Sequence, residues 1–128
     1  MTNSVKWPSF LQGMGIFVAV LAAHLPMLWR PFIWDDLLLL REIRAFGPWN
    51  VFAPDHFGFI RPGKVALFSL LDAFFRDFPP GWNAIGLFLI AINAVLIFRL
   101  AREWVAEPGA LVAALAFAVH PLQVEAVG

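Results

Sequence analysis

Two adjacent carboxylates, Asp35 and Asp36, stand a few residues after an apolar segment that ends at Trp29. A carboxylate can accept the proton of an attacking hydroxyl group, or hold a divalent metal cation that activates this group. Charged side chains beside a bilayer are costly unless they are solvated or used. We therefore take Asp35 and Asp36 as candidate catalytic residues, with Asp35 as the preferred base and candidate metal ligand.

A structural role for the same pair is an open alternative. Residues 37–46 (LLLLREIRAF) have the pattern of a short amphipathic helix, and a carboxylate just before such a helix is a good cap. Successive helical residues point about 100° apart, so one Asp can face a substrate while the other caps the helix.

Two further polar residues lie in the segment that follows. The guanidinium fork of Arg61 matches phosphate oxygens, and His56 can shuttle a proton or bind a metal beside Asp55. We assign Arg61 and His56 to a candidate site for the phosphate of a lipid-linked donor substrate. The alternatives are an interfacial arginine that meets lipid headgroups and a histidine solvated in a loop.

His120 and Glu125 follow the third apolar segment of the chain. If the chain crosses a membrane three times, both residues emerge on the same side as the Asp pair, and we expect them to line the same cavity. Alternatively, His120 and Pro121 simply end a helix. The sequence contains no Gly-rich phosphate loop, HExxH motif or paired-Cys motif that would indicate a different chemistry.

The composition predicts a membrane protein. Hydrophobic residues make up 61% of the 128 residues and charged residues 14%, with a mean hydropathy of +0.77. Soluble domains are about 45–50% apolar and about 25% charged, so the excess apolar surface needs the lipid bilayer as its partner. A net charge of zero argues against nucleic-acid binding, and the lack of Cys excludes disulfides and thiolate metal sites.

We predict an all-α integral membrane domain over residues 1–128. About 20 apolar residues cross the hydrocarbon core, so three segments are expected to span it. These are residues 10–29, residues 82–100 and the shorter residues 107–119. The loop over residues 30–81 is expected to carry two amphipathic interfacial helices, over residues 37–46 and 63–78.

The side on which this loop lies is left open by the charges. Residues 30–78 contain six Lys and Arg, whereas Lys6 alone precedes the first apolar segment and Arg99 and Arg102 mark the far end of the second. The positive-inside rule taken alone places the loop in the cytoplasm. Six acidic residues share the loop, although the rule gives them little weight. We read the first apolar segment as a retained anchor rather than a cleaved signal peptide.

The order of the motifs resembles the start of the polytopic GT-C glycosyltransferases, and most of all the membrane portion of the tetratricopeptide-repeat O-mannosyltransferase-like proteins. The resemblance covers residues 10–128, and its most specific part is an Ala-rich segment that ends in FAVHPLQVEAV. The motifs are, in order, Trp34-Asp35-Asp36, Arg61-Pro62, Trp82, Asn93-Ala94 and the run from His120 to Val127.

The resemblance implies a multi-pass transferase of the inner or plasma membrane that moves a sugar from a polyprenyl-phosphate donor to a protein or lipid acceptor. It implies a non-cytoplasmic first loop whose Asp35 or Asp36 acts as base or holds a divalent cation. It also implies that the 128 residues are the first part of a larger enzyme and inactive alone. The chain departs from the family pattern at Asn83, Gly86 and Ile90, where His, Asn and His are expected.

A rival interpretation belongs to a different class of protein. A small non-enzymatic membrane protein, whose charged loop contacts an assembly partner, would have the same composition. A transporter would show polar breaks inside paired spans, and the apolar segments lack such breaks.

Overall fold

The computed structural model describes residues 9–55, 58–120 and 122–123, and this part of the chain is helical apart from turns and short connections. In the described residues there is no β-strand, which confirms the predicted all-α class for them. The elements are α1 (Ser9–His24), the 3-10 helix η1 (Leu25–Trp29), α2 (Trp34–Phe46), the 3-10 helix η2 (Pro48–Asn50), α3 (Pro62–Phe75), α4 (Pro79–Ala101) and α5 (Glu107–Ala118).

The helix ends differ from the predicted ones by a few residues, for local reasons. The helix α2 begins at Trp34, so both Asp residues lie within it. The helix α3 ends at Phe75, because Arg76 adopts a φ of 42° that cannot continue a helix. Pro79 opens the next helix, α4, where the missing N–H of proline has no intrahelical partner to lose.

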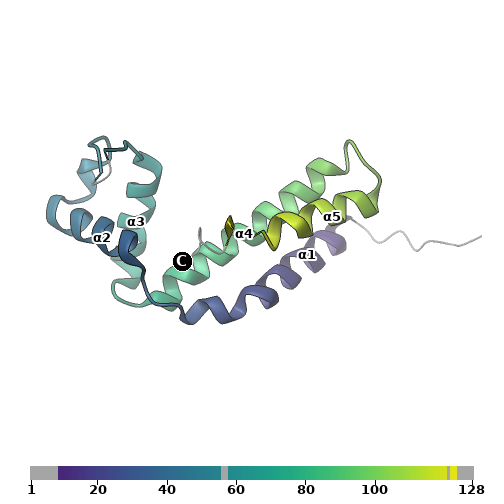
Figure 1. Cartoon of the computed structure of the whole chain (residues 1–128), viewed down its shortest axis with the longest axis horizontal. Coiled ribbons are helices and arrows are strands. Elements are labelled where there is room, and N and C mark those ends of the chain that lie inside the picture. Colours follow the sequence, from purple (N-terminus) through teal and green to yellow (C-terminus); the bar gives the residue numbers. More distant parts are fainter. Residues whose placement is uncertain (1–8, 56–57, 121, 124–128) are drawn as a thin grey trace, which may run out of the picture.

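The helices α1, α4 and α5 pack as an elongated bundle (Figure 1), in which α4 contacts both of the other helices. Alanine dominates their shared core, which allows the helix backbones to approach closely. The buried residues of this core are Ile16, Val20, Ile90, Ala91, Ala94, Phe98, Ala110, Ala114 and Ala118.

Two helical segments are long and apolar enough to cross a membrane. Phe10–Trp29 has a mean hydropathy of 1.7 and Pro79–Ala101 a mean hydropathy of 2.3. The buried share of these segments is only 22% and 28%, so most of their apolar surface faces outwards. A helix that is apolar all round is expected either inside the core of a large protein or inside a bilayer. Both segments are therefore candidate membrane-spanning helices.

The third apolar helix is too short to match them. With 12 residues, α5 is about 18 Å long at about 1.5 Å per residue, whereas α4, with 23 residues, is about 34 Å long. Figure 1 shows α5 running back along α4 from the turn that joins them and ending well before α2 and α3.

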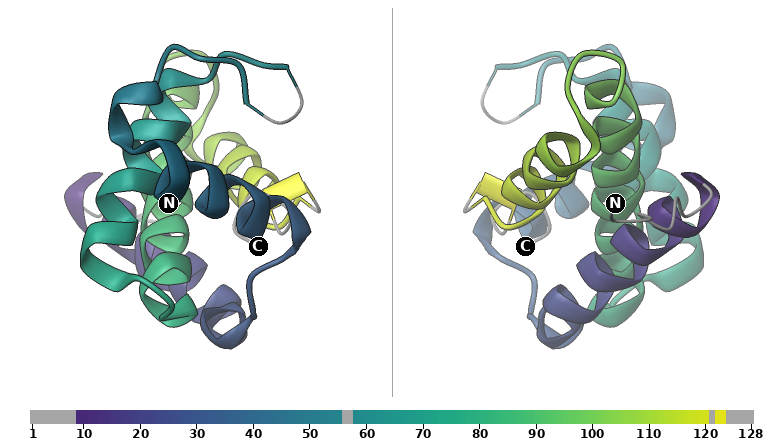
Figure 2. Two further views of the ribbon diagram at one scale, coloured as in Figure 1. Left: turned by 90° about the vertical axis from the view of Figure 1, so that its left-hand side faces the viewer. Right: turned by 90° about the vertical axis from the view of Figure 1, so that its right-hand side faces the viewer.

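The helices α2 and α3 form a separate unit, the α2–α3 unit (residues 34–75), at the end of the bundle where η1 finishes and α4 begins (Figures 1 and 2). Leu39 and Ile43 of α2 pack on Val65 of α3. The ring of Trp82, in the first turns of α4, lies edge-on to Phe68 at a centroid distance of 5.2 Å. This apolar contact joins the unit to the bundle.

A polar contact marks the opposite end of the bundle. Gln12 of α1 donates a hydrogen bond of 2.6 Å to Oε1 of Glu107 at the start of α5. Arg102, just after α4, donates a hydrogen bond of 3.1 Å to Oε1 of the same glutamine. The three helix ends therefore meet at one level, and the α2–α3 unit lies at the other end.

Candidate functional site

The acidic pair lies in the first turn of α2, a few residues after the first candidate span. The residue that caps α2 is Ile33, whose carbonyl accepts hydrogen bonds from the backbone N–H of Asp36 (3.1 Å) and Leu37 (3.2 Å). The expectation that one Asp is the N-cap is therefore wrong. Carboxylates inside the first turn are still favoured by the helix dipole. Asp36 is half-buried, and the side chain of Asp35 lies outside the described part of the structure.

A buried amide fixes the chain that leads into this turn. Asn83 of α4 is 6% exposed, and its Nδ2 donates to the backbone carbonyls of Met27 (3.1 Å), Leu28 (3.0 Å) and Arg30 (2.9 Å). Carbonyls at the end of a helix lack intrahelical partners. The amide serves the carbonyls of Leu28 and Arg30, and it shares that of Met27 with the N–H of Arg30. Asn83 thus connects the end of η1 to the start of α4.

The junction between α3 and α4 is held by a second buried side chain. The indole N–H of Trp82 donates a hydrogen bond of 2.9 Å to the carbonyl of Arg76, the residue with positive φ. Gly81 lies against the ring of Phe75, where an added Cβ would come within 2.6 Å of Cγ. The junction is therefore closely packed and leaves room only for glycine at position 81.

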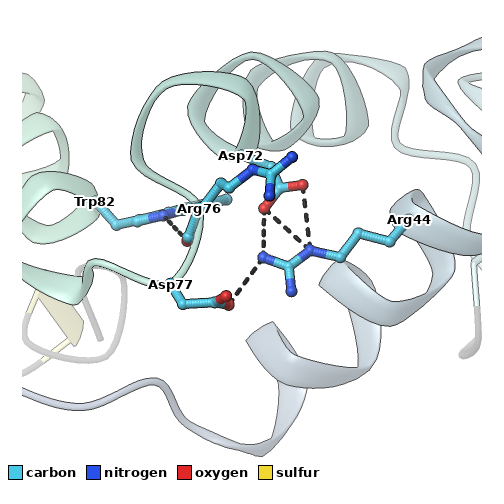
Figure 3. Close-up of polar contacts among 5 residues, drawn as sticks. All are labelled: Arg44, Asp72, Arg76, Asp77 and Trp82. Carbon is cyan, nitrogen blue, oxygen red and sulfur yellow. Dashed lines mark hydrogen bonds and ion pairs between the residues drawn. The ribbon is translucent and has the colours of Figure 1, made fainter.

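Arg44 joins α2 to α3 and to the junction after it (Figure 3). Its Nη2 donates to Oδ1 of Asp72 at 2.6 Å and to Oδ1 of Asp77 at 2.9 Å, and its Nε donates to both carboxylate oxygens of Asp72 at 3.2 Å. The hydrogen bond to Asp72, and then that to Asp77, raise the pKa of Arg44 above its ordinary value. Arg44 and Asp72 are 28 residues apart in the chain, so the sequence alone did not indicate that they form an ion pair.

Arg61 is bound by a carboxylate of the same loop. It donates from Nε to Oδ2 of Asp55 at 2.8 Å and from Nη2 to the same oxygen, while its guanidinium lies 5.2 Å from the ring centroid of Phe59. Oδ1 of Asp55 accepts the backbone N–H of Phe59 at 3.0 Å. The Arg61 side chain is 40% exposed and that of Asp55 is 7% exposed. His56 lies outside the described residues.

A small cavity beside Asp55 offers no room for a sugar. It has a volume of about 20 Å³ and is lined by residues that include Glu42, Ile43, Pro54 and Asp55. One water molecule needs about 10–15 Å³ measured in this way. The cavity beside Asp55 therefore has room for about one water molecule.

His120 follows α5 and is exposed, with its Nδ1 accepting the N–H of Leu122 at 3.3 Å. The helix α5 itself ends well before the α2–α3 unit (Figure 1). Glu125 lies outside the described residues. The predicted cavity lined by both residues remains a prediction.

The acidic pair fits only one part of a divalent cation site. Among the described residues, no group of three or more His, Asp or Glu side chains comes together. Mg²⁺ is commonly held by one or two carboxylates together with substrate phosphates and water. Asp35 and Asp36 are adjacent and match the carboxylate part of that set.

The sequence indicated the candidate site residues themselves, but it did not indicate the residues that hold them in place. The acidic pair and Arg61 are on one unit, whereas Asn83, Arg44 and Gly81 hold that unit in place. No family model, curated protein or solved structure matches the chain.

Proposed function

We propose that this chain is the acidic-loop part of a GT-C-type membrane glycosyltransferase, which transfers a sugar from a polyprenyl-phosphate donor to a protein or lipid acceptor. One observation carries the proposal. The Asp35-Asp36 pair opens a helix that follows the first candidate span directly, and the α2–α3 unit holds that helix across one end of the bundle. The motif order in the sequence, from Trp34-Asp35-Asp36 to HPLQVEAV, supports the same class.

The proposed reaction needs one carboxylate in a defined place. The acceptor hydroxyl oxygen forms a bond to the anomeric carbon, and the bond from that carbon to the phosphate oxygen breaks. The hydroxyl proton goes to Asp35 or Asp36, and the electron pair leaves with the polyprenyl phosphate. A divalent cation held by the same carboxylates would stabilise the negative charge on the leaving phosphate.

Arg61 is proposed as the residue that meets the donor phosphate. Its contacts with Asp55 use Nε and Nη2, so the edge of the guanidinium that carries Nη1 faces away from that carboxylate. A guanidinium presents two donor edges, and a phosphate can take the second in a bidentate contact. Asp55 would thus orient Arg61 while the exposed edge binds the donor. His56 is proposed to contribute at the same place.

The bilayer arrangement that goes with this function has the α2–α3 unit on the non-cytoplasmic surface of the inner or plasma membrane. Residues 9–29 and α4 would cross the bilayer, and α5 would begin a third crossing. The outer face of α3 would rest in the headgroup region, since large apolar residues on it are exposed. These residues are Leu67, Leu70, Phe74 and, just after the helix, Phe78.

The experiment is a transfer assay on membranes that contain the protein as its host expresses it. Tritium-labelled polyprenyl-phosphate mannose and glucose are supplied as donors, and label in protein and lipid fractions is measured. The double variant Asp35→Asn, Asp36→Asn should lose transfer. The control variant Glu103→Gln changes an exposed acid in the turn between α4 and α5 and should keep it. Equal transfer by the double variant and the parent would refute the catalytic role.

A second candidate is a non-enzymatic membrane protein, in which the charges of the α2–α3 unit have a structural role. Arg44 contacts Asp72 and Asp77, and Arg61 contacts Asp55, so several charges of the α2–α3 unit stabilise the unit itself. A protein of this class would show no label transfer with any donor. Its Asp variants would instead lose a copurifying membrane partner.

A further inference from the structure

The segment from Phe46, the last residue of α2, to Ile60, shortly before α3, exposes an unusual number of large apolar side chains. Five of its fifteen residues, 46–60, are aromatic. Trp49 is 92% exposed and Phe52 75% exposed, which is almost full exposure for side chains of this size. The other exposed members of this aromatic segment are Phe46, Phe59 and Ile60. Large apolar groups gathered on one short segment indicate an interaction surface.

The described parts of this segment are held in place by backbone and side-chain contacts. Val51 packs against the cluster formed by Leu39, Ile43 and Val65. The backbone N–H of Asp55 donates to the carbonyl of Phe59 at 2.8 Å, and the carboxylate of Asp55 accepts the N–H of Phe59 in return. The exposed rings are therefore carried on a backbone that is anchored to the α2–α3 unit.

The position of the segment and the cations beside it favour a lipid surface as the partner. The segment belongs to the α2–α3 unit. This unit covers the end of the bundle where the first candidate span ends and the second begins (Figure 2). Aromatic rings, Trp in particular, prefer the headgroup region of a bilayer. Arg61 and Lys64 follow the segment. Arg61 is paired with Asp55, whereas the ammonium of Lys64, 5.1 Å from the ring centroid of Phe68, supplies positive charge that anionic headgroups attract.

We infer that the aromatic segment, in its described residues 46–55 and 58–60, docks into the lipid headgroup layer and so anchors the α2–α3 unit at the membrane surface. This inference rests on the membrane placement proposed above. Docking at Trp49 and Phe52 would add a third attachment of the α2–α3 unit, beside the chain connections before α2 and after α3. An open face of α2 would then be presented to a donor whose polyprenyl tail lies in the same leaflet.

The test uses the natural lack of Cys in the chain. Trp49→Cys and Phe52→Cys variants of the whole chain are labelled with an environment-sensitive fluorophore and reconstituted in vesicles of phosphatidylcholine and phosphatidylglycerol. Arg41→Cys, on an exposed position of α2 outside the segment, is the matched control. Phe88→Cys, in the middle of α4 and 48% exposed, reports membrane insertion independently.

The inference predicts that labels at residues 49 and 52 emit at shorter wavelength than the label at residue 41. They should also be several-fold less accessible to iodide and should be quenched by headgroup-labelled lipid, at every ratio of lipid to protein. Iodide access at residues 49 and 52 equal to that at residue 41 would overturn it. Protection that is lost on dilution in lipid would also overturn it, because a second copy would then be the partner.

The Phe88 label separates this inference from the proposed function. Quenching at residue 88 by lipid labelled deep in the acyl chain, together with exposed labels at residues 49 and 52, leaves the spans intact and rejects only the docking. No deep quenching at residue 88 would reject the membrane placement itself, and the docking with it.

Discussion

The side-chain amide of Asn83 donates a hydrogen bond of 2.9 Å to the backbone carbonyl of Arg30, a residue that precedes it by 53 positions. The same Nδ2 also donates to Met27 and Leu28. The contact joins the end of the first candidate span to the start of the second. Since α2 begins only four residues after Arg30, Asn83 also fixes where the acidic turn starts.

Replacing Asn83 by Ala should destabilise the fold. The part-buried carbonyls of Leu28 and Arg30 would lose this donor, and such a loss costs about 1–3 kcal/mol in the free energy of unfolding. Detergent-titrated unfolding of the reconstituted chain measures this change. The matched control is Asn93→Ala in the same helix, where the side chain is exposed. The two variants should differ by at least the lower end of that range, and equal stabilities would contradict the role given to Asn83.

Replacing Arg44 by Lys should loosen the contact of α2 with the α3–α4 junction. A Lys ammonium cannot reproduce the fork that engages Asp72 and Asp77 together. Because Arg44 is 41% exposed, we expect a loss of about 1 kcal/mol or less, which shrinks further in high salt. Hydrogen exchange of the α3 amides at two salt concentrations tests this, with Arg41→Lys on the same helix as the control.

The pH dependence of that contact follows from the sign of the pKa shift. The pKa of Arg44 is raised in the folded chain by the hydrogen bond to Asp72 and then by that to Asp77. A cation with a raised pKa contributes stability that is complete below its unfolded pKa and is lost only as the pH rises through the folded value. The difference between Arg44 and Arg44→Ala chains should therefore be constant from about pH 7 to about pH 10. A difference that fades within this window would contradict the arrangement.

Replacing Gly81 by Ala should disrupt the α3–α4 junction. The new Cβ would lie within 2.6 Å of Cγ and 2.8 Å of Cε1 of the Phe75 ring, so the ring or the backbone has to move. Overpacking of this kind costs about 1–3 kcal/mol. Gly63→Ala, in the first turn of α3, meets no atom within 4 Å and should be neutral or slightly stabilising. Equal thermal stability of the two variants would show that the junction is not closely packed.

The helices were predictable because their signals are local. Apolar runs of the right length indicated α1 and α4, and Pro62 marked the start of α3. The start of α2 was misplaced because Trp34, Asp35 and Asp36 read as a cap, whereas Ile33 is the residue in the extended conformation before the helix. Local pattern does not distinguish a capping carboxylate from one that lies inside the first turn.

The contacts that position the site were not predictable, since they join residues far apart in the chain. Arg44 and Asp72 come from two helices whose relative register depends on how Leu39, Ile43 and Val65 pack. Asn83 was read as a departure from a family pattern, and only its burial against η1 gives it a role. The bounds of α5 were predicted closely, as residues 107–119 against Glu107–Ala118, but its packing along α4 depends on a core that joins distant residues.

The side of the membrane that carries the α2–α3 unit can be read by cysteine labelling. Asp55 is unsuitable for this, because its carboxylate is buried and bonded to Arg61. Ala45 is exposed on α2, and Glu103 is exposed at the opposite end of the bundle. An impermeant maleimide should label Ala45→Cys only from the non-cytoplasmic side and Glu103→Cys only from the cytoplasmic side. The reverse pattern would contradict the proposed orientation.

The most direct test of the proposed function compares the two acids one at a time. Sugar transfer from labelled polyprenyl-phosphate donors is measured in membranes that carry the parent protein, Asp35→Asn or Asp36→Asn, at matched protein levels. Loss of a catalytic base lowers the rate by about 100-fold or more, and we predict that loss for Asp35→Asn, with a smaller loss for Asp36→Asn. Transfer at the parent rate by both single variants would contradict the account.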